Sequence, residues 1–166
     1  VENMEEEAGA LFDIEELEVK SAEDVVAQRE EALAKQLEEM RKRKRKLVDP
    51  LQFEMSIHAE DLVDYVPGFG WEQSPVSDKQ KQTLEKFGIF TDEIGNAGKA
   101  AKLLDRLAKR RDEGLTTPKQ IRLLERYGFR NVGMWQFDQA KSMIDRIAAA
   151  GWRCPAGVSP REYQPG

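Results

Sequence analysis

Basic residues recur at matched positions, forty residues apart, in the second half of this 166-residue chain. They are the side chains whose type and spacing best suit chemistry. The charge is kept in three pairs: Lys79 and Lys119, Lys86 and Arg126, and Arg106 and Arg146. Exposed lysines and arginines bind phosphate, and a lysine beside a helix N-terminus adds to an anion site. The alternative is that these cations pair with neighbouring acidic side chains.

A separate basic run extends from Arg41 to Lys46, and every residue in it is Lys or Arg. At a helix C-terminus these cations would complement the helix dipole and stay in water. They would otherwise form a second phosphate-contacting patch or, in a eukaryote, a nuclear-import signal. A third group, Lys109 to Arg111, also falls at a predicted helix end. The second patch adds these residues to the candidate nucleic-acid site: Lys42, Arg43, Lys44, Arg45 and Lys46.

Motifs for catalysis, nucleotides or metals are missing from the sequence. Gly98-Lys99 lacks the earlier glycine and the following hydroxyl of a phosphate-binding loop, so it more simply begins a helix. His58 is the one histidine and has no second ligand beside it. Cys154 is the one cysteine and has no base nearby in the sequence. We therefore expect no catalytic residue, cofactor or metal in this chain.

Two aromatic residues distinguish the second repeat from the first. Trp135 and Phe137 stand where the first repeat has Gly95 and Ala97. Aromatic rings stack on the bases of single-stranded nucleic acid. They also pack locally against a neighbouring helix, which is the simpler interpretation.

Two copies of one helical unit position these residues. Each copy opens with a capping box, a hydroxyl residue followed three positions later by glutamine, and its first helix ends at a glycine. These residues are Ser77, Gln80 and Gly88 in the first copy and Thr117, Gln120 and Gly128 in the second. The second helices are predicted near 98–111 and 138–150. One copy is too small to fold alone, so we expect both to pack as a small four-helix domain.

The remaining segments complete an all-α prediction. Val26, Leu33 and Met40 recur every seven residues of a long predicted helix, which favours one partner helix or self-association. Tyr65, Phe69 and Trp71 should anchor the connector on the repeats, and Trp152 should plug the last helix. The predicted segments are an acidic flexible segment 1–20, a long charged helix 21–47, an irregular connector 48–76, repeats 77–115 and 116–154, and a tail 155–166.

The charge is unevenly divided along the chain. The net charge is −5, yet residues 1–70 carry −10 and residues 71–166 carry +5. A basic half suits a polyanionic partner. Charged residues make up 34% of the chain, and no apolar run reaches the length of a membrane span. We expect a cytoplasmic protein with no membrane partner. Because the chain opens at Val1, we expect it to be a piece of a longer polypeptide.

Residues 48–155 resemble the C-terminal region of DEAD/DEAH-box-type superfamily-two helicases of bacteria, phages and other mobile elements. The resemblance is carried by Tyr65-Val66-Pro67 through Trp71-Glu72, by the twofold Ser/Thr-x-Lys-Gln-x-x-x-Leu-Glu pattern, by Leu104-Asp105-Arg106-Leu107 with Arg110 to Leu115, and by Trp152 to Pro155.

The resemblance implies a non-catalytic C-terminal module of a DNA helicase. The ATP-binding, hydrolytic lobes of such a protein would lie outside this chain, since none of their motifs is present, and the module's partners would be nucleic acid and that ATPase core. An alternative is a protein–protein interaction module that docks on the helicase core without touching nucleic acid.

Overall fold

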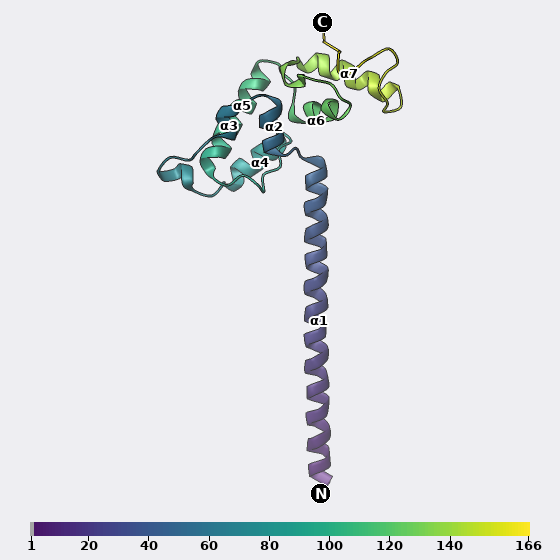
Figure 1. Ribbon diagram of the computed structural model, residues 1–166. Helices are drawn as coiled ribbons and strands as arrows, with labels where there is room; N and C mark the ends of the chain where they lie inside the picture. The colour runs from purple at the N-terminus through teal and green to yellow at the C-terminus, as the bar shows by residue number, and fades with distance from the viewer. Residues whose placement is uncertain (1) are drawn as a thin grey trace. The chain divides into compact units, whose positions relative to one another are not determined.

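The computed structural model describes the backbone of residues 2–166 and the side chains of residues 21–166. The all-α prediction is confirmed at the level of class, because the described residues form seven α-helices and two short 3-10 helices with no strand (Figure 1). No helix among them is long and apolar enough to cross a membrane. The chain divides into two units, Val1–Lys42 and Arg43–Gly166, which we describe separately. The prediction of a flexible segment at 1–20 concerns residues outside those whose side chains are described.

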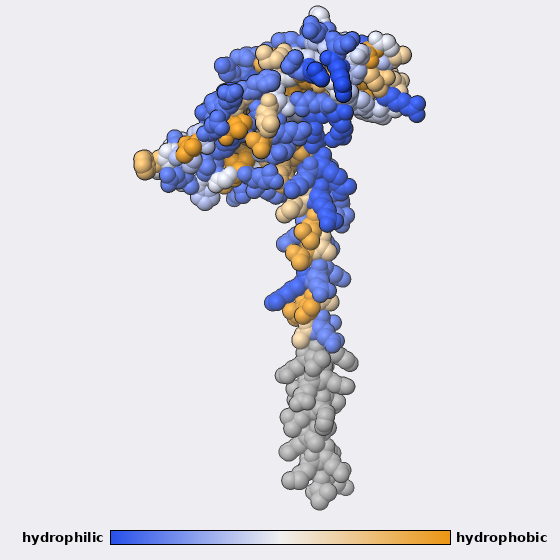
Figure 2. Space-filling model, viewed as in Figure 1, coloured by the Kyte–Doolittle hydropathy of each residue, from blue (hydrophilic) through white to orange (hydrophobic). Residues whose placement is uncertain are grey.

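The first unit is formed by α1, Glu2–Lys46, whose last turn belongs to the second unit. Apolar side chains on its described part are exposed rather than buried, and Figure 2 shows them as orange patches among charged residues. These residues are Val25, Val26, Leu33, Leu37 and Met40. An exposed apolar stripe of this width fits one further helix.

The first helices of the two repeats, α4 (Asp78–Lys86) and α6 (Pro118–Arg126), begin and end forty residues apart. Both predicted capping boxes are confirmed. In each, the backbone N–H of the glutamine donates to the hydroxyl of the N-cap residue at 3.2 Å. Both helices also stop at the predicted glycine. Gly88 and Gly128 take φ values of +89° and +96°, in the left-handed region that residues with a side chain rarely adopt.

The second helices are α5 (Ala97–Asp112) and α7 (Phe137–Ala149), within one residue of the predicted boundaries. The capping glutamine of each first helix also reaches the second helix. Gln80 Nε2 donates to the Ala97 carbonyl at 3.2 Å, and Gln120 Nε2 donates to the Phe137 carbonyl at 3.4 Å. The same side chain therefore caps one helix and fixes the start of the next in both repeats.

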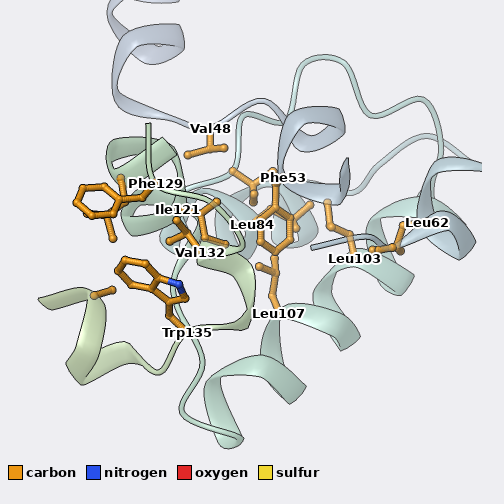
Figure 3. Close-up of a cluster of buried hydrophobic side chains, with 14 of the residues drawn as sticks. Val48, Phe53, Leu62, Leu84, Leu103, Leu107, Ile121, Phe129, Val132 and Trp135 are labelled. Carbon is orange, nitrogen blue, oxygen red and sulfur yellow. The ribbon is translucent and has the colours of Figure 1, made fainter. Parts of the chain in front are cut away.

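The connector is not irregular as predicted, because it contains α2 (Pro50–Ser56), α3 (Glu60–Val63) and the 3-10 helix η1 (Gly70–Gln73). Pro50 stands at the start of α2, where a missing N–H costs nothing. The connector shares one apolar cluster with α4 to α7 and the 3-10 helix η2 (Val132–Met134), as Figure 3 shows. The labelled members of the cluster are Val48, Phe53, Leu62, Leu84, Leu103, Leu107, Ile121, Phe129, Val132 and Trp135.

Three predicted anchors prove wrong, because their side chains face water. Phe69 is 96% exposed, Trp71 is 60% exposed and Trp152 is 59% exposed. A residue of the tail covers the second repeat instead. Tyr163 lies with its ring centroid 5.6 Å from Phe129 and 5.5 Å from Trp135, the spacing of packed aromatic rings.

Candidate nucleic-acid interface

Five of the six matched cations stay available to a ligand. Their side chains are exposed, and no ion pair engages them within the described part of the chain. They are Lys79, Lys86, Lys119, Arg126 and Arg146. The exception is Arg106, whose Nη2 lies 2.8 Å from Asp61 Oδ2 on α3. Arg106 therefore joins α5 to the connector, and we remove it from the site.

The basic run at the end of α1 is used largely within the protein. Arg43 donates to Glu85 and lies 3.2 Å from Asp92 Oδ1. Lys44 lies 3.9 Å from Glu93 Oε1, and Lys42 pairs with Glu38 one turn earlier at 3.6 Å. The contacts of Arg43 and Lys44 hold the last turn of α1 on α4 and on the segment that follows α4. We therefore do not place the predicted second patch, which also included Arg45 and Lys46, in the site.

Two of the matched cations, Lys86 and Lys119, meet where the repeats join. A hollow, which we call the junction hollow, lies between the C-terminal ends of α4 and α5 and the N-terminal ends of α6 and α7. Its volume is about 490 Å³. The lining residues are Lys86, Phe87, Leu107, Arg110, Arg111, Gly114, Leu115, Thr116, Thr117, Pro118, Gln136, Phe137 and Asp138.

Positive charge outweighs negative charge around the junction hollow. Lys86, Arg110 and Arg111 line it, whereas Asp138 is the one carboxylate among the lining residues. Lys119 adds a fourth cation beside it. A methyl group placed on Gly88 would lie 3.0 Å from Lys119 Cε, so the lysine stem rests on the turn that follows Lys86. Three different helices thus bring cations to one place.

Lys86, at the end of α4, and Arg110 and Arg111, at the end of α5, also complement the dipoles of those helices. Lys119 does not, because it lies in the first turn of α6, where a positive charge is unfavourable by a few tenths of a kcal/mol. Free backbone N–H groups at a helix N-terminus can hold an anion, and a nearby lysine adds to that attraction.

Arg110 lines the hollow and also donates hydrogen bonds to the second repeat. Its Nη2 donates to the Gly133 carbonyl at 2.8 Å and to the Thr116 hydroxyl at 3.1 Å. Burial lowers the pKa of Arg110 below its ordinary value and neighbouring Arg106 lowers it further, against the opposing effect of Glu113. An arginine remains charged at neutral pH even so. It therefore contributes positive potential to the hollow while fixing the connection between the repeats.

Two groups in this site escaped the sequence-based prediction. Arg110 and Arg111 were assigned only to the helix dipole, and the signal that could have found them is their place next to the start of the second repeat. The two aromatic residues that distinguish the second repeat have different environments. Trp135 is 3% exposed within the core, as expected for packing, whereas Phe137 is 42% exposed and lines the hollow.

Gly98-Lys99 is a structural element. Lys99 Nζ lies 2.8 Å from Glu54 Oε1, in a pair whose carboxylate is almost fully buried, and also donates to the Leu62 carbonyl. The backbone at Gly98 has no room for a side chain, because a methyl group there would clash with the Tyr65 hydroxyl. Among the residues whose side chains are described, no group of three His, Cys, Asp or Glu could hold a metal ion.

Comparison with protein families, with curated proteins and with solved structures finds no match for this chain. The geometry of the junction hollow and the resemblance seen in the sequence are therefore the grounds for a functional proposal.

Proposed function

We propose that this chain is a non-catalytic module that binds nucleic acid at the junction hollow, as an accessory part of a helicase. The observation that supports this proposal best is the gathering of Lys86, Lys119 and Arg111 from three helices around one hollow. Phosphate groups are the chemical partners that such a cluster suits, because each neutralised phosphate releases a condensed counterion.

The resemblance to superfamily-two helicases supplies the biological setting of the proposal. A module of this kind would hold nucleic acid near the motor, and strand separation and ATP hydrolysis would belong to other parts of the polypeptide. DNA is the ligand that the resemblance implies.

Charge reversal tests the proposal directly. We expect Lys86→Glu and Lys119→Glu each to weaken binding of a labelled oligonucleotide roughly ten-fold at low salt, with binding followed by fluorescence anisotropy. Each variant should also reduce the slope of log K against log salt by about one, because one phosphate contact is lost.

Lys81→Glu is the matched control. Lys81 is exposed on the same helix but lies five residues before Lys86, about 140° around the axis. It should leave the slope unchanged. If all three variants weaken binding equally, the interaction is with the overall charge of the chain and the junction hollow is not the site.

A protein-interaction module is the second candidate, and exposed apolar residues favour it. Val66, Phe69 and Trp71 lie in the segment around η1 with their side chains in water, and the stripe of α1 is exposed as well. A partner bound through these surfaces would show little dependence on salt, whereas phosphate binding falls steeply between about 50 and 200 mM. A salt titration therefore separates the two candidates.

A further inference from the structure

The junction hollow has an apolar floor that a phosphate-binding patch does not need. Phe87, Leu107, Leu115, Pro118 and Phe137 all line it. Backbone phosphates are bound by cations on an open surface, and an apolar recess beneath the cations adds nothing to that contact. The recess suits a ligand that carries a flat, largely apolar group next to an anionic one.

Phe137 is the part of this floor that most resembles a stacking platform. It is the first residue of α7, and its backbone N–H donates to the Gly114 carbonyl at 2.8 Å, which fixes its position. The ring remains 42% exposed although it lines a hollow. The first repeat has Ala97 at this position, where the residue is buried. The helical repeat therefore does not need an aromatic side chain here.

Two cations line the same hollow as Phe137. Lys86 and Arg111 line the hollow with exposed side chains, and the Arg111 guanidinium lies 5.7 Å from the ring centroid of Phe87. Gln136 and Asp138 add polar groups for the edge of a base. An apolar cavity of this size, with a few convergent polar groups, is typical of a small-ligand site.

We propose that the junction hollow takes one unpaired base of a single strand, stacked on Phe137, while Lys86 and Arg111 contact the flanking phosphates. This inference rests on the proposed function and adds strandedness to it. A base in a duplex is stacked and paired, so it would enter the hollow only after extrusion, at a cost of a few kcal/mol. A single strand presents its bases without that cost, and the chain should prefer it.

An abasic strand tests this inference with the full chain. Two oligonucleotides of about 15 nucleotides, a length typical of single-strand sites, would be compared by fluorescence anisotropy: oligothymidine and its abasic analogue, which keeps the phosphates but lacks the bases. We expect the chain to bind oligothymidine roughly ten-fold more tightly, the change that one stacked base provides. A duplex of the same length should bind more weakly than oligothymidine.

Phe137→Ala supplies the matching variant, because alanine is the residue found at this place in the first repeat. It should lose roughly ten-fold on oligothymidine and nothing on the abasic strand. Phe69→Ala removes another exposed phenylalanine, outside the hollow, and should bind both strands as the unchanged chain does.

The outcomes separate the two proposals. Equal binding of oligothymidine and the abasic strand by the unchanged chain overturns the base pocket and leaves phosphate binding in place. An unaltered affinity of Phe137→Ala for oligothymidine also overturns it. If neither strand binds at low salt, the proposed function fails together with this inference. The comparison of the two strands needs no variant, so the test holds even if Phe137→Ala does not fold.

Discussion

At the scale of single residues, Lys99 and Glu54 form an ion pair that is largely buried. The Glu54 side chain is almost fully buried, and the Lys99 side chain is largely so. Two charges taken out of water are tolerated only while they neutralise each other. This pair joins α5 to α2, so it fixes the connector to the first repeat through electrostatics as well as through apolar packing.

We expect Lys99→Met to lower the free energy of unfolding by about 3–5 kcal/mol, because the buried Glu54 carboxylate would lose its partner. Lys109→Met is the control on the same helix, since Lys109 is exposed and pairs only with Glu113 at 4.0 Å. That variant should change the stability by less than about 1 kcal/mol. Urea unfolding of both variants measures the difference, and similar losses would show that the buried pair has no special weight.

At the scale of elements, helix ends are held by side chains from distant segments. Arg122 of α6 donates to the carbonyl groups of Leu47, Arg45 and Lys46, at 2.7, 3.1 and 3.4 Å. These carbonyls end α1 and would otherwise lack a partner within the helix. Burial lowers the pKa of Arg122 first, and neighbouring Arg126 adds to the effect. The first repeat has Gln82 at the equivalent position.

We expect Arg122→Met to destabilise the second unit by about 1.5–3 kcal/mol, the usual contribution of hydrogen bonds to a charged donor. The aliphatic part of methionine keeps most of the packing, so the loss reports the hydrogen bonds. Arg126→Met, one turn later and exposed, should be close to neutral. Thermal unfolding followed by circular dichroism would compare the two, and equal melting temperatures would count against a capping role.

How much of the elements could be predicted from sequence depends on how local their causes are. Capping boxes act within one turn, so the starts of α4 and α6 were predicted correctly, and the boundaries of α5 and α7 were predicted within one residue. α2 was missed because the connector 48–76 was predicted to be irregular, although Pro50 stands where the first turn of a helix tolerates proline. The contacts of Lys99 and Arg122 join segments more than thirty residues apart, and nothing local in the sequence marks them.

Some features of the candidate site could likewise be predicted from the sequence, and others could not. The matched positions correctly indicated exposed cations at Lys86 and Lys119. They could not indicate that Arg106 faces Asp61 across the connector. Matched residues occupy the same position within each repeat, but the neighbours that surround them in the folded protein differ. The site arises where the repeats meet, and that relation is set by the fold.

At the scale of the whole second unit, the C-terminal tail belongs to the core. Tyr163 completes an aromatic cluster with Phe129 and Trp135, with centroid distances of 5.5–5.6 Å. Val158 packs against the same core. The predicted plug, Trp152, contributes its backbone and not its ring. Its carbonyl accepts a hydrogen bond from the Tyr127 hydroxyl at 2.7 Å, and its N–H donates to the Ile147 carbonyl at 2.9 Å.

We expect Tyr163→Ala to lower the free energy of unfolding by about 2–4 kcal/mol, because it removes a packed ring and leaves a cavity beside the rings of Phe129 and Trp135. Trp152→Ala removes a larger ring that faces water and should cost less than about 1 kcal/mol. Denaturant titrations would rank the two. A greater loss at position 152 would return the covering role to Trp152.

The glycine turn that ends α4 is covered by a residue of the second repeat, and the glycine turn that ends α6 is covered by a residue of the tail. Lys119 lies over Gly88, and Pro160 lies 3.5 Å from where a methyl group on Gly128 would be. The tail therefore covers the same turn of the second repeat that the second repeat covers on the first. A third repeat inserted after residue 154 would compete with the tail for this turn. A longer array would therefore need the tail to follow its last repeat.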